Sequence, residues 1–154
     1  AAAVVANFES TIAKVVSLSS VMSIVTGMGG NAGTQSLTIL CRGLSLGEVD
    51  KDNAFQILCK EITVGLLSGI VIGIIVAIGA WWFASNPWFG LVAGLAMILN
   101  MLAANIAGYL VPVILKRLNI DPALASGVFV TTVTDCMGFF FFLGLATLFL
   151  PLLV

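Results

Sequence analysis

Long stretches without a charged residue dominate the chain, and short polar segments separate them. No charged residue occurs between Val15 and Cys41, or between Ile62 and Leu115. A membrane-crossing helix needs about 20 largely apolar residues at a rise of about 1.5 Å each, so the second stretch is too long for a single crossing. The pattern therefore predicts several helices that cross a membrane.

Two proline-containing turns divide the remaining chain into helices. Ser85-Asn86-Pro87 interrupts the long apolar stretch, and Pro122 begins a last helix, whose end region Pro151 marks. We predict an all-α, polytopic membrane helix bundle that forms a single domain over residues 1–154. Its expected parts are the end of an earlier helix at 1–9 and full helices at about 12–45, 55–84, 87–117 and 122–150.

Aromatic and basic residues predict how these helices lie in a membrane. Tryptophans favour the headgroup level, which places the 85–87 turn at one membrane face. Five of the six basic residues fall in the two loops on the opposite side, which the positive-inside rule makes cytoplasmic. We therefore expect a multi-pass protein of the cell membrane (inner or plasma membrane), surrounded by the lipid bilayer, with its C-terminus outside. The residues concerned are Trp81, Trp82 and Trp88, and Arg42, Lys51, Lys60, Lys116 and Arg117.

Composition agrees with this interpretation and excludes several functions. The chain is 60% hydrophobic and 8% charged, whereas a soluble domain carries about 25% charged residues. Its net charge of -1 gives no reason to expect binding to nucleic acid. There is no histidine, no pairing of a nucleophile with a base, and no metal-binding cysteine spacing, so we do not expect an enzyme or a structural zinc site.

Asp135 is the most informative polar residue. It lies 14 residues beyond the cytoplasmic start of the last predicted helix, about 20 Å along the helix axis. A carboxyl group at this depth costs several kcal/mol unless it meets water, a cation or a partner. No basic residue is expected at this depth, so a bound cation is the favoured explanation. The alternative is a protonated aspartate that bonds to a neighbouring helix.

A second polar feature is the segment Gly27-Met28-Gly29-Gly30-Asn31-Ala32-Gly33-Thr34-Gln35-Ser36. Its side-chain oxygens interrupt an apolar span, which is tolerated where the segment is buried or lines a wet cavity. A phosphate-binding loop is disfavoured, because no alternating strand precedes it and no lysine follows Gly33. Oxygen ligands favour magnesium or calcium over zinc or copper, and magnesium suits a site with few carboxylates and retained water.

Other patterns have simpler structural interpretations. Gly65, Gly69 and Gly73 form a bare stripe that permits close approach of another helix, in the same chain or a partner. Asp121 before Pro122 is typical of a helix N-cap, which is favoured over ion binding. Glu61 follows a charged cytoplasmic loop, whose acids are most often solvated although they could also attract cations at a pore mouth.

Several of these motifs, taken in order, resemble the MgtE family of magnesium channels and transporters. The matching segments are Gly29 to Ser36 followed by Arg42-Gly43, then Lys60-Glu61, Asn119-Ile120-Asp121-Pro122-Ala123-Leu124, and Thr134-Asp135 ahead of Gly138. The similarity begins near Phe8 and continues to the C-terminus. Ser23 departs from the family pattern, because a proline is expected there.

The resemblance implies a homodimer with five membrane helices per subunit, the first largely missing here, and a pore between the subunits. It implies Mg2+ as both the transported and the bound ion, with Asp135 as the pore aspartate. It also raises the expectation that Asp121 and Glu61 meet ions. Regulatory cytosolic domains are expected in the full-length protein, but no such domain lies in this sequence. Our hypothesis is passive passage of Mg2+, with Asn31, Thr34 and Thr131 lining the site, mostly through water.

Two alternatives to a channel remain open at this point. In an ion-coupled secondary transporter of divalent cations, Asp135 would carry a proton during each cycle. In a non-conducting structural membrane subunit, the same aspartate would only bond to a neighbouring helix. Ion flux that requires a proton or sodium gradient distinguishes the first alternative, and unchanged ion passage after Asp135→Asn distinguishes the second.

Overall fold

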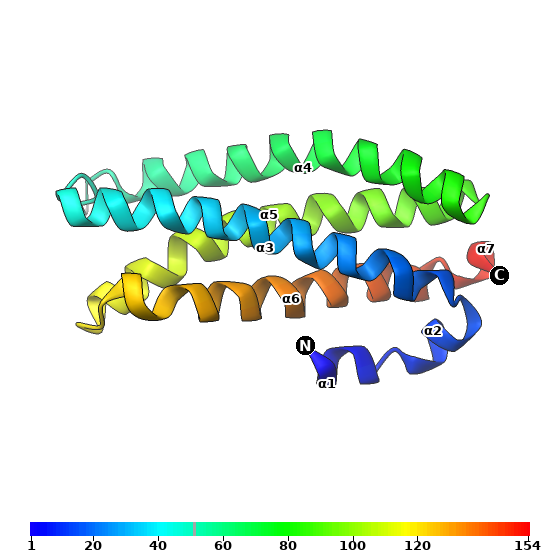
Figure 1. Ribbon diagram of the computed structural model, residues 1–154. Helices are drawn as coiled ribbons and strands as arrows, with labels where there is room; N and C mark the ends of the chain where they lie inside the picture. The colour runs from blue at the N-terminus through cyan, green and yellow to red at the C-terminus, as the bar shows by residue number, and fades with distance from the viewer. Residues whose placement is uncertain (51) are drawn as a thin grey trace.

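The computed structural model describes residues 1–50 and 52–154, apart from the side chains of residues 124 and 125. Every regular element in this part of the chain is a helix. Four helices are long: α3 (Ser17–Leu46), α4 (Ala54–Ala84), α5 (Pro87–Arg117) and α6 (Pro122–Leu148). They lie side by side, and α3 and α5 run in the opposite direction to α4 and α6 (Figure 1). The predicted all-α bundle is confirmed.

Among the residues that the structure describes, three helical segments are long and apolar enough to cross a membrane: Ala54–Ala84, Pro87–Arg117 and Ser126–Leu148. Helix α3 is of similar length, with 30 residues, but contains the glycine-rich polar segment. Large apolar side chains on α4 are exposed, among them Ile75, Trp82 and Phe83. Because water disfavours such a surface, the molecule is a membrane helix bundle, as predicted.

Helix α5 is central, because it packs against α3, α4 and α6. Small residues such as Ala93, Ala96 and Ala104 are fully buried on it and allow the neighbouring helices to approach closely. Helix α4 packs almost entirely against α5. A Cβ added at Gly69 would lie 3.2 Å from the Cα of Ile98, so this part of the glycine stripe touches backbone. The stripe therefore serves helix packing within one chain.

Two helices begin where the sequence predicts, each after an asparagine or aspartate that precedes a proline. The Asn86 side chain accepts a hydrogen bond of 2.9 Å from the backbone N–H of Trp88. The Asp121 carboxylate accepts one of 2.9 Å from the N–H of Ala123. In each case a proline at the first helical position has no N–H that would need a partner.

The predicted helix at 12–45 is wrong near its start, because the structure divides it into α2 (Glu9–Lys14) and α3. Val15 leaves the helical conformation with φ -130° and ψ 81°. The adjacent β-branched Val15 and Val16 have low helix propensity, and the bend buries both Val15 and Leu18 in the core. A hydrogen bond of 2.8 Å between the Thr11 and Thr147 hydroxyls then joins α2 to the end of α6.

Near both ends of the chain, the structure has shorter helices than the sequence predicts. The predicted stub at 1–9 contains α1 (Ala2–Ala6), which packs with α2 against α6 (Figure 1). The last predicted helix, 122–150, ends at Leu148 and is followed by α7 (Leu150–Leu153). Pro151 stands in the first turn of α7, where it needs no backbone donor.

Candidate functional site

The glycine-rich segment of α3 lies directly against α6. A Cβ added at Gly33 would lie 2.8 Å from Val130 Cγ1, and one added at Gly30 would lie 3.8 Å from Thr134 Oγ1. Because the helices are antiparallel, Gly33 meets the earlier of these α6 residues and Gly30 the later one. The absence of a side chain at Gly33 is therefore what allows α3 and α6 to touch at this level.

Asp135 directly follows Thr134 and so lies at the level of this crossing. Its side chain is half-buried and has no hydrogen-bond partner among the described residues, whereas nearby hydroxyls bond to their own backbone. Thr131 Oγ1, for example, donates to the carbonyl of Gly127 at 3.0 Å. At this level of the bundle, the Asp135 carboxylate thus receives no hydrogen bond from the described residues and is free to bind water or a cation.

Polar side chains also project from the exposed side of α3 at the same level. Asn31, Thr34, Gln35 and Thr38 are exposed, and they line a shallow depression together with Ile39. The Thr34 hydroxyl donates to the carbonyl of Gly30 at 2.8 Å, so its own oxygen can still accept a bond. The helix therefore presents oxygens, as a site for a hydrated cation requires.

We call Asn31, Thr34, Thr131 and Asp135 the polar layer, because they share one level of the bundle. The contacts of Gly30 with Thr134 and of Gly33 with Val130 fix that level. All four side chains are exposed or half-buried rather than sealed in the core. Four of the six residues expected at an ion site thus share a level, at a surface of the single chain.

The other two expected site residues lie elsewhere. Glu61 is 8% exposed, and its Oε2 accepts a hydrogen bond of 2.6 Å from Ser36 Oγ at the junction of α3, α4 and α5. Asp121 caps the start of α6, about 20 Å along the helix from Asp135. In residues 1–50 and 52–154, no three His, Cys, Asp or Glu side chains converge as a metal-binding group.

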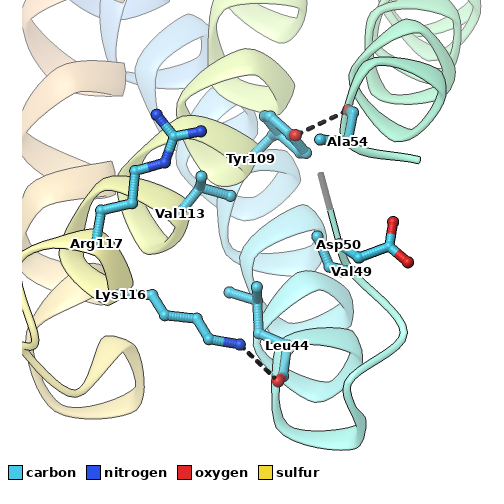
Figure 2. A pocket seen from close by; sticks show the side chains of 8 residues that line it. All are labelled: Leu44, Val49, Asp50, Ala54, Tyr109, Val113, Lys116 and Arg117. Carbon is cyan, nitrogen blue, oxygen red and sulfur yellow. Dashed lines mark hydrogen bonds between the residues drawn. The ribbon is translucent and has the colours of Figure 1, made fainter. Parts of the chain in front are cut away.

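A pocket at the end of the bundle predicted to be cytoplasmic joins α3, α4 and α5 (Figure 2). Lys116 Nζ donates a hydrogen bond of 3.0 Å to the carbonyl of Leu44, in the last turn of α3. The Tyr109 hydroxyl donates one of 2.8 Å to the carbonyl of Ala54, at the start of α4. The Leu44 carbonyl belongs to the last turn of α3, where the helix itself supplies no partner, so the Lys116 bond satisfies it. The Tyr109 bond ties the start of α4 to α5.

The sequence interpretation did not single out Asn100 of α5, a polar residue that is 0% exposed. It lies between α3 and α6, where its Nδ2 donates 2.8 Å to the carbonyl of Val25. The available signal was an amide in the middle of the charge-free stretch 62–115. Such a side chain must find a partner within the protein, because lipid offers none.

Comparison with known proteins identifies the family. Residues 22–145 match MgtE, the divalent cation transporter family. The chain is 35% identical over 151 residues to the magnesium transporter MgtE of Enterococcus faecalis, covering 97% of this chain and 33% of that protein. It is 33% identical to those of Bacillus subtilis (96% and 33% covered) and Thermus thermophilus (94% and 32%). It thus spans about a third of the length of these relatives. The chain belongs to the MgtE family of divalent cation transporters.

Proposed function

We propose that this chain is the ion-conducting part of a magnesium channel, in which hydrated Mg2+ passes through a pore between two copies of the chain. The observation that carries the proposal is the half-buried Asp135 carboxylate, which has no partner among the described residues and lies where α3 crosses α6. A carboxylate at this depth needs compensation, and a cation with its water shell supplies it.

The ligand chemistry supports magnesium as the ion. The polar layer offers one carboxylate, one amide and two hydroxyls, and no thiolate or imidazole. Magnesium keeps several of its waters and is commonly held by one or two carboxylates, which suits this sparse oxygen set. The relatives that cover most of this chain are named magnesium transporters.

The surface position of the polar layer supports a homodimer. In a single chain these polar groups would face lipid, which solvates neither a carboxylate nor an amide. A second copy placed against the same surface would enclose the layer and bring two Asp135 carboxylates to one ion path. We propose that the loop between α3 and α4 faces the cytoplasm, where domains of the complete protein outside this third would regulate passage.

Mg2+ uptake into proteoliposomes tests the proposal, with the complete protein as wild type and as Asp135→Asn. We expect at least a tenfold loss of uptake in the variant, because the amide lacks the charge that attracts Mg2+. The matched control is Asp52→Asn, in which an exposed loop carboxylate is neutralised in the same way. Equal uptake by wild type and Asp135→Asn would instead indicate a structural role, and an absolute need for a proton gradient would indicate coupled transport.

A further inference from the structure

The amide of Asn100 is only half satisfied, although it is fully buried. Its Nδ2 donates to the carbonyl of Val25 on α3 at 2.8 Å, which links α5 to α3. Its Oδ1 is buried and has no hydrogen-bond partner among the described residues. A buried oxygen without a donor destabilises the fold, so such a group in a native structure calls for an explanation.

Two glycines provide the space that the Asn100 amide fills. A Cβ added at Gly29 of α3 would lie 2.1 Å from Asn100 Nδ2, and one added at Gly138 of α6 would lie 2.8 Å from the same atom. The amide therefore fits between two helix backbones and touches both. Gly138 lies three residues after Asp135, so the position of α6 at this contact determines where the carboxylate lies.

Packing alone does not account for an asparagine here. An apolar side chain of similar shape would fill the same space without a buried oxygen that lacks a donor. An amide adds what an apolar side chain lacks: a directional bond to one particular carbonyl, that of Val25. Because a hydrogen bond is directional, this bond favours one rotation and one height of α3 relative to α5.

We propose that Asn100 is a positioning residue for the ion site. By bonding to α3 and filling the gap beside Gly138, it sets the relative position of α3 and α6, and hence of the polar layer. Asn100 itself does not contact the ion. The inference rests on the proposed function in that the polar layer is the place where Mg2+ passes.

The first test measures helix position without measuring transport. In the complete protein with Cys41, Cys59 and Cys136 changed to serine, Gly30→Cys and Thr134→Cys place two thiols at the crossing, where a Cβ at Gly30 lies 3.8 Å from Thr134 Oγ1. We expect the rate of disulfide formation to fall about threefold or more when Asn100→Ala is added, since interhelical hydrogen bonds in membranes shift equilibria by about this factor. The matched control is Asn105→Ala, whose amide packs beside Gly65 of α4 but donates its hydrogen bond within α5, from Nδ2 to the carbonyl of Met101.

The second test measures Mg2+ uptake with the cysteines intact. We expect Asn100→Ala to raise the Mg2+ concentration for half-maximal uptake about threefold to tenfold, while Asn105→Ala changes it less than twofold. In the double variant Gly29→Ala/Asn100→Ala, the new methyl group occupies space that the amide vacates. We expect this variant to fold like wild type but to keep the weakened uptake, because the bond to Val25 is still missing.

The outcomes separate this inference from the proposed function. Wild-type uptake and wild-type disulfide formation in Asn100→Ala, or full recovery of uptake in the double variant, would show that Asn100 only fills space. If the wild-type protein carried no Mg2+ but Asn100→Ala altered disulfide formation, the proposed function would fail and the effect of Asn100 on helix position would stand. Should Asn100→Ala fail to fold, the double variant is used for both measurements with the same expected results.

Discussion

The Ser36 hydroxyl donates a hydrogen bond of 2.6 Å to Oε2 of Glu61, so that a serine of the glycine-rich helix α3 holds a buried carboxylate of α4. Both side chains are more than nine-tenths buried. Helix α4 otherwise packs almost entirely against α5. This bond is therefore a specific link between α4 and the helix that carries Asn31 and Thr34.

Removing this donor should destabilise the bundle. We expect Ser36→Ala to lower the free energy of unfolding by about 1–3 kcal/mol, because a buried carboxylate oxygen loses its hydrogen-bond partner. The measurement is the thermal unfolding midpoint in detergent. Ser68→Ala is the control, since that hydroxyl bonds at 2.6 Å to the Val64 carbonyl within α4 and its loss should change stability by less than about 0.5 kcal/mol. Equal midpoints for both variants would contradict the role given to Ser36.

The contact between α4 and α5 should depend on Gly90. A Cβ there would lie 2.5 Å from the carbonyl oxygen of Ala77, so Gly90→Ala forces two backbones apart. We expect a loss of about 1–3 kcal/mol, visible as a lower unfolding midpoint. At Gly79 the added methyl group meets nothing within 4 Å, so Gly79→Ala should be neutral or stabilise α4 by up to about 1 kcal/mol. A smaller effect at Gly90 than at Gly79 would show that the two helices pack differently.

The proposed homodimer predicts which surfaces of two copies meet. In a background without the three native cysteines, Thr34→Cys should form a disulfide-linked dimer in membranes under mild oxidation, because Thr34 belongs to the exposed polar layer. Ile75→Cys, on the exposed apolar face of α4, should stay monomeric under the same conditions. Gel mobility without reductant is the measurement, and the reverse pattern would place the interface on α4.

The proposed orientation predicts which loops a membrane-impermeant thiol reagent reaches. Asp52→Cys should be protected in intact cells and react only after permeabilisation, since basic residues surround this loop. Ser85→Cys, in the turn between Trp82 and Trp88, should react in intact cells. Labelling of Asp52→Cys alone in intact cells would indicate the reverse orientation. Labelling of both cysteines in intact cells would contradict the proposed topology.

The sequence predicts the helix boundaries well where local chemistry sets them. The prolines at 87 and 122, each preceded by a capping side chain, begin helices at the expected residues. No glycine or proline marks the break at Val15. The break instead accompanies the burial of Val15 and Leu18 against the rest of the core. Such a tertiary effect cannot be inferred from the local sequence.

The candidate site was predictable in part. Asp135 and the oxygens of α3 stand out because they interrupt apolar helices. The burial of Glu61 could not be predicted from the sequence, because a charged loop precedes this residue. Only the packing of α3, α4 and α5 directs its side chain inward, to Ser36. Asn100 was missed for a related reason, since its importance arises from two glycines on other helices, Gly29 and Gly138.

The near absence of side chains where α3 meets its neighbours limits how the protein can move. The Gly33 carbonyl oxygen lies 2.7 Å from where a Cβ at Gly108 would stand, and Val130 closes the other side. Turning α3 by one residue, about 100°, would bring a larger side chain into space that is already filled. An opening of the proposed ion path would therefore require α3 to tilt or move away from these neighbours, and a crosslink across this contact would prevent that movement.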